Sequence, residues 1–135
     1  MIRIVADTNV LVSALLYPER PIGFIVELLQ EGSIGLVYSD ATLQELKRVM
    51  ERLKFDPATV SELIDLIQIK GIFVQPKESI RKIKEDPTDN KFLEAAVAGQ
   101  ARFVVSGDGH LKALRFYQGV AVVTPAEFLK FLLEP

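Results

Sequence analysis

The sequence predicts an α/β fold, in which a short, mainly parallel central sheet of about five strands has helices on both faces in a three-layer α/β/α arrangement. Two observations predict it. Short apolar runs rich in Ile, Val and Phe alternate with longer segments of helical period. The runs are almost continuously apolar, as expected of strands covered on both sides. No repeat or linker interrupts the 135 residues, so we expect a single domain, 1–135.

The expected strands are residues 2–6, 35–38, 72–74, 102–106 and 120–123. The expected helices begin at Pro21, at about Asp40, and at the pairs Asp56-Pro57, Asp86-Pro87 and Thr124-Pro125. Proline suits the first turn of a helix, and glycine suits the position just after its end. The first, third and fourth of these helices are therefore expected to end at Gly32, Gly71 and Gly99.

The composition excludes several kinds of chemistry. The chain has no Cys and one His, which removes disulfides, thiol catalysis, iron–sulfur clusters and zinc sites built from Cys or several His. Any metal must be held by oxygen. The net charge of -2 argues against a broad electrostatic grip on nucleic acid, although a local basic patch is compatible with it. No apolar run suits a membrane span or a signal peptide, so we expect a cytoplasmic protein.

Two acids fall where a parallel sheet binds ligands. Asp7 directly follows the first expected strand and Asp108 directly follows the fourth, which places both at the carboxyl edge of the sheet. For either residue alone the simpler interpretation is a turn residue or a helix N-cap.

Three further acids lie on expected helices. With Pro87 at the first helical position, Asp86 suits the N-cap. The Asp89 carboxylate in the first turn either interacts favourably with the helix dipole or points into a neighbouring site. Glu45 lies at the edge of the apolar stripe of its helix, with Arg48 on the same side. That pair is either a helix-surface ion pair or an acid beside a phosphate-binding cation.

Acids from distant segments that converge on one sheet edge would repel each other. A divalent cation removes that repulsion, and Mg²⁺ or Mn²⁺ prefers carboxylate and water ligands. Two such ions, typically about 4 Å apart, activate water for in-line attack and stabilise the leaving oxygen.

Four segments resemble the motifs of PIN-domain ribonucleases of the VapC toxin type, and the resemblance covers essentially the whole chain. They read VADTNVLVSA at 5–14, SDATLQEL at 39–46, DPTDNKFLEAA at 86–96 and VVSGDGHL at 104–111. The resemblance implies a metal-dependent endoribonuclease with Mg²⁺ or Mn²⁺ at four catalytic and metal-binding acids, namely Asp7, Glu45, Asp89 and Asp108. Asp86 is a fifth candidate ligand or a cap.

The same resemblance implies supporting residues and partners. Polar side chains that bond the acids or metal-bound water are expected at Thr8, Asn9 and Ser106. Positive charge, and not the resemblance, makes Lys47, Arg48, Arg52 and Lys91 the candidate RNA contacts, although such charges are more often solvated surface. Members of the family commonly form homodimers, and an antitoxin protein holds the toxins inactive by reaching into the acidic pocket with a basic side chain.

Other interpretations stay open. One alternative is a PIN-like module that binds RNA or protein without cutting. A haloacid-dehalogenase phosphatase needs a second Asp two residues after the first, where this chain has Asn9. A receiver domain needs an Asp where Gln75 and Pro76 stand. His110 is a candidate general base, although metal-bound water needs none. A toxin and an RNA-processing enzyme are not distinguished.

Overall fold

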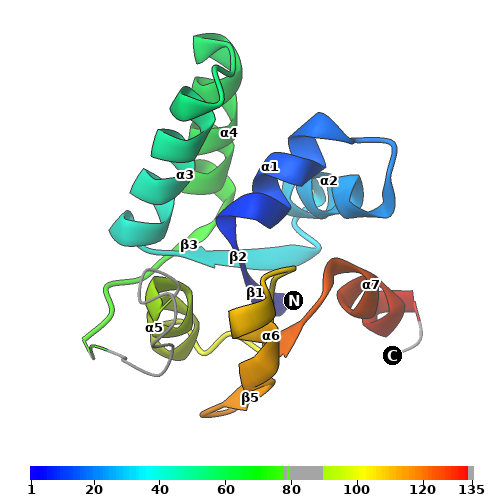
Figure 1. Cartoon of the computed structure of the whole chain (residues 1–135), viewed down its shortest axis with the longest axis vertical. Helices are drawn as coiled ribbons and strands as arrows, with labels where there is room; N and C mark the ends of the chain where they lie inside the picture. Colours follow the sequence, from blue (N-terminus) through cyan, green and yellow to red (C-terminus); the bar gives the residue numbers. More distant parts are fainter. Residues whose placement is uncertain (78, 80–89, 134–135) are drawn as a thin grey trace.

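A single sheet runs through the computed structural model, which describes residues 1–77, 79 and 90–133 (Figure 1). Its six strands lie in the order β3-β2-β1-β4-β6-β5, and all neighbours are parallel except β5 and β6. The strands are β1 (Ile2–Ala6), β2 (Ile34–Tyr38), β3 (Ile72–Phe73), β4 (Phe103–Val105), β5 (Phe116–Tyr117) and β6 (Val120–Val123). This confirms the predicted α/β class.

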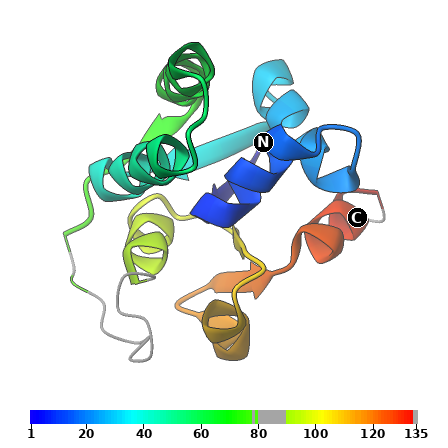
Figure 2. The same cartoon turned by 45° about the horizontal axis from the view of Figure 1, so that its top comes forward.

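Helices cover both faces of this sheet (Figure 2). They are α1 (Thr8–Leu16), the 3-10 turn η1 (Pro21–Gly23), α2 (Phe24–Glu31), α3 (Asp40–Arg52), α4 (Pro57–Lys70), α5 (Asn90–Ala98), α6 (Gly109–Leu114) and α7 (Pro125–Leu133). None of those in the described part of the chain is long and apolar enough to cross a membrane.

Two buried clusters fill the space between the sheet and its helices. Because neighbouring residues of a strand point to opposite faces, Leu36 joins the cluster under α1 to α4 and α7, whereas Val37 joins the cluster under α5 and α6. The second cluster is rich in alanine, with Ala95 and Ala96 fully buried. Small side chains let α5 lie close to β1, β2 and β4.

The order of the strands creates one position suited to a ligand. The chain runs from β1 outward through β2 and β3, and then returns to place β4 on the opposite side of β1. Loops that leave β1 and β4 therefore diverge, and open α/β sheets bind ligands in the crevice at such a switch point. The backbone N–H of Asp7 donates to Val105 O at 3.0 Å, which keeps the two strand ends together.

The structure contains three elements beyond those predicted, namely α1, α6 and β5. The apolar run in α1 includes the buried, β-branched Val10 and Val12, and such a run does not by itself distinguish helix from strand. The other two elements are only six and two residues long. Pro21 begins a 3-10 turn that leads into α2, rather than the α-helix itself. The predicted helix start at Asp86-Pro87 lies outside the described residues.

Candidate active site

Asp7 lies at the junction of β1 and α1 and is 4% exposed. Its Oδ1 accepts a hydrogen bond from the backbone N–H of Val10 at 2.8 Å, which caps the helix. Its Oδ2 accepts a hydrogen bond from the Ser106 hydroxyl. The N-cap interpretation of Asp7 is therefore confirmed. Because a carboxylate offers about four lone-pair positions, both oxygens keep capacity for a further ligand.

Ser106 connects Asp7 to Asp108 across the boundary between β1 and β4. The fully buried Ser106 hydroxyl donates to Asp7 and accepts from the backbone N–H of Asp108 at 2.9 Å. The Oδ1 of Asp108 accepts from the backbone N–H of Leu111 at 3.1 Å, which caps α6. Both residues predicted from strand ends thus lie at the switch point, where one hydroxyl bonds the Asp7 carboxylate and the Asp108 backbone.

Glu45 is contacted by side chains from two other helices. Its Oε2 accepts from the Thr8 hydroxyl at 2.7 Å, and its Oε1 forms a 2.6 Å ion pair with Lys91 Nζ. Glu45 itself lies in the second turn of α3, whose start is fixed by a capping box between Ser39 and Thr42. The carboxylate therefore lies where α1, α3 and α5 meet.

Burial dominates the electrostatics of Asp7 and raises its pKa above the ordinary value of 3.8. The hydrogen bonds from Ser106 and Val10 oppose this rise, because they favour the charged form. The negative charges of Asp108 and Glu45 add to the rise in the pKa of Asp7. Asp7 is thus within electrostatic reach of two other carboxyl groups, Asp108 beyond β4 and Glu45 on α3.

The sequence comparisons agree with this geometry. The chain matches the PIN domain family over residues 3–110. It belongs to the PIN-domain family. Members of this family are generally metal-dependent nucleases, and Asp7, Glu45 and Asp108 all lie inside the matched region.

A relative of this PIN domain occurs in Methanocaldococcus jannaschii. The two proteins are 26% identical over 142 residues, which cover 96% of this chain and 90% of the relative. That relative is an uncharacterized protein, so it adds a match along the whole chain and no more specific activity.

The acids of this PIN domain have the chemistry that a divalent cation requires. Asp7 is a buried carboxylate repelled by two others, and a hard cation held by oxygen would remove that repulsion. Within 1–77, 79 and 90–133, however, no group of three or more His, Asp or Glu side chains is placed to hold a metal together. The predicted ligands Asp86 and Asp89 lie outside the described residues.

Two of the three polar residues expected beside the acids contact them, namely Thr8 and Ser106, whereas Asn9 is exposed. The side chain of His110 lies outside the described part. Of the expected RNA contacts, Lys47, Arg48 and Arg52 are exposed on α3. Two of them, with Gln44 and Glu51, line a surface hollow of about 270 Å³.

The contact of Lys91 with Glu45 was not predictable from sequence. The two residues are 46 positions apart on different helices, and only the packing of α3 against α5 brings them together. Lys91 was predicted to contact RNA, and the structure shows it paired with Glu45.

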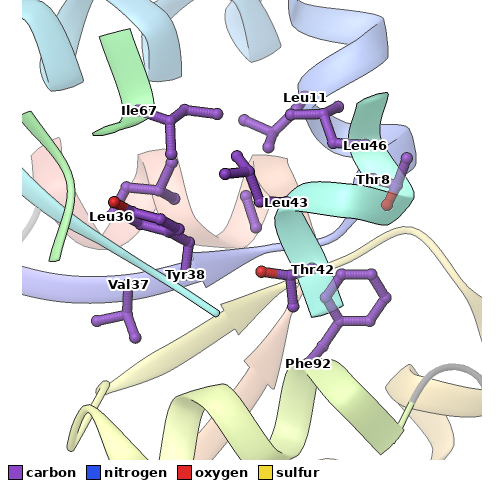
Figure 3. Close-up of a pocket in the computed structure, with 11 residues that line it drawn as sticks. Thr8, Leu11, Leu36, Val37, Tyr38, Thr42, Leu43, Leu46, Ile67 and Phe92 are labelled. Atoms are coloured by element: carbon purple, nitrogen blue, oxygen red, sulfur yellow. The ribbon is translucent and has the colours of Figure 1, made fainter. Parts of the chain in front are cut away.

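A small void lies between α1, α3, α5 and β2 (Figure 3). Its volume is about 10 Å³, and its lining is mostly apolar, with Thr8 and Thr42 among the exceptions. A space of this size holds about one water molecule, so it is a packing gap and not a substrate site. Leu43 and Leu46 of α3 and Phe92 of α5 line it, so the void lies between the helices that carry Glu45 and Lys91.

Proposed function

We propose that this PIN domain is a metal-dependent endoribonuclease that hydrolyses RNA phosphodiester bonds at Asp7, Glu45, Asp89 and Asp108. One observation carries the proposal: at the switch point between β1 and β4, the buried Ser106 hydroxyl donates to the Asp7 carboxylate and accepts from the backbone N–H of Asp108. Ligands of open α/β sheets bind at this position. The charge of Glu45 acts on Asp7, and we include Glu45 as a further proposed ligand.

The chain's own residues would hold and orient a cation there. The contacts from Val10 and Ser106 fix the Asp7 carboxylate, and that from Leu111 fixes Asp108. When bound, Mg²⁺ or Mn²⁺ would activate water and offset the negative charge of the phosphate. Asp86 is proposed as an additional ligand or as a cap. The exposed cations of α3 would contact the RNA backbone, together with Lys91 in the way argued below.

The finer biological role rests on the resemblance of the motifs to VapC-type toxins. We extend the proposal to the toxin of a toxin–antitoxin pair, acting as a cytoplasmic homodimer. A basic side chain of an antitoxin would then bind the acidic site. Co-purification of the chain with a small protein encoded beside it, and loss of nuclease activity in the complex, would support this role. Full activity in such a complex would contradict it.

One observation favours a second candidate function. Lys91 already provides a positive charge at Glu45, as it would in a PIN-like module that binds RNA or protein without cutting. Such a module would bind RNA and leave it intact at every metal concentration.

The deciding experiment measures cleavage of a mixed RNA panel with Mg²⁺ or Mn²⁺. The wild type is expected to cut, and both a chelator and Asp7→Asn are expected to abolish cutting. Asp65→Asn is the matched control, because Asp65 is exposed on α4 and is expected to cut like the wild type. Folded wild type that binds RNA and Mn²⁺ but leaves the whole panel intact would favour the non-catalytic module.

A further inference from the structure

The Lys91–Glu45 ion pair lies inside the candidate active site, not on the open surface. The Lys91 and Glu45 side chains are 16% and 17% exposed, and their charged atoms are 2.6 Å apart. Glu45 is also held by Thr8, the residue that follows Asp7. A positive charge is therefore built in beside Glu45, one of the two carboxylates whose charges act on the buried Asp7.

This arrangement gives Glu45 two possible positive partners. An ammonium group and a divalent cation both bind carboxylate oxygen, and both would reduce the repulsion around Asp7. Among the three described acids of the site, Glu45 accepts the hydrogen bonds given above from side chains, whereas Asp7 and Asp108 each accept from a backbone N–H and cap a helix. The Glu45 carboxylate can therefore change partner without disturbing the start of a helix.

We infer that Lys91 is an internal counter-ion that competes with the divalent cation for Glu45 and so sets the cation affinity of the site. The inference rests on the proposed function, because it assumes a cation site at these acids. Lysine suits such an exchange: its ammonium is a compact charge on a flexible stem, with three donors that reorient freely.

The exchange gives Lys91 a second role when the cation takes Glu45. The ammonium is then released at the site itself, where a phosphate oxygen of the RNA would be its next acceptor. The expected RNA contact of Lys91 and its observed contact with Glu45 are thus two states of one side chain.

The test measures Mn²⁺ affinity by calorimetry and by the electron paramagnetic resonance of free Mn²⁺, without RNA. Lys91→Met is expected to bind Mn²⁺ at least about fivefold more tightly, since it removes the competing charge. Lys91→Arg keeps the charge and adds a bidentate donor, so its affinity is expected to equal or fall below that of the wild type. Lys91→Gln provides the same readout where the methionine variant fails to fold.

A double-mutant cycle shows whether Lys91 acts through Glu45. In a Glu45→Gln background, the effect of Lys91→Met on Mn²⁺ affinity is expected to fall below about twofold. A folded Lys91→Met or Lys91→Gln protein that binds Mn²⁺ no more tightly than the wild type overturns the inference. The same holds if neither the wild type nor these variants bind Mn²⁺.

Affinity and cleavage are separate readouts, which keeps the two proposals apart. If the Mn²⁺ affinities change as expected but no RNA is cleaved, the proposed nuclease activity is contradicted and the role of Lys91 as counter-ion is supported. Metal-dependent cleavage with unchanged Mn²⁺ affinity in the Lys91 variants would do the reverse.

Discussion

Asp7 shows how one residue serves both the fold and the candidate site. Its carboxylate caps α1 and accepts a hydrogen bond from Ser106, and both contacts favour the charged form. Burial and the nearby charges of Asp108 and Glu45 disfavour that form and prevail, since the pKa of Asp7 is raised. Ionised Asp7 therefore lowers the stability of the metal-free protein, as residues kept for function often do.

We predict a pH-dependent stability difference between Asp7→Asn and the wild type. With a raised folded pKa, Asp7 contributes stability that is fully present below the unfolded value of 3.8 and is lost as pH rises through the folded pKa. Asparagine keeps an oxygen acceptor for Val10 and does not ionise. The stability of the variant relative to the wild type is therefore expected to increase as the pH rises from about 4 through the folded pKa of Asp7.

Urea unfolding of both proteins in chelator, across that pH range, measures this difference. Asp65→Asn is the control, because Asp65 is exposed on α4. An Asp7→Asn difference that matches the control at every pH would mean that the buried carboxyl carries no cost.

At the scale of elements, α5 is positioned by its close approach to β2. A Cβ added at Gly99, just after α5, would lie 2.5 Å from Cγ1 of Val37. Val37 is 2% exposed and so has little room to move. The same helix begins with the buried Asn90 and carries Lys91. The distance between α5 and the sheet therefore also affects the ion pair between Lys91 and Glu45.

We predict that Gly99→Ala lowers the free energy of unfolding by about 1 to 3 kcal/mol, because the added methyl overfills a packed interface. Gly107→Ala is the matched control, since nothing lies within 4 Å of the Cβ it would add. Urea denaturation compares the two variants with the wild type. Equal effects of both substitutions would mean that the approach of α5 to Val37 is not tight.

Sequence reasoning was most successful where local pattern determines structure. The apolar runs predicted β1 and β6 to the residue, because buried parallel strands leave a continuous signature. Strand ends then placed Asp7 and Asp108 together. The pattern was insufficient for α1, whose apolar run suits strand or helix alike. It was also insufficient for the partner of Glu45, which depends on how α3 and α5 pack.

At the scale of the whole molecule, the proposed cation site predicts that stability depends on divalent cations. We predict that Mn²⁺ at about 100 times its dissociation constant raises the free energy of unfolding by about 2.7 kcal/mol, because it binds the folded state alone. Thermal and urea unfolding with and without Mn²⁺ measure the change. Asp7→Asn is expected to lose most of it, and Asp65→Asn to keep it. Equal gains in all three proteins would place the binding elsewhere.

The two ends of the sheet limit how copies of this chain can associate. The edge strands β3 and β5 are each two residues long, so little unpaired backbone is available for another strand to join. Short edges of this kind protect natural sheets from edge-to-edge aggregation. A pair of copies joined through one continuous sheet is therefore disfavoured. The homodimer proposed above would have to form through helical surfaces, leaving the strand edges to solvent.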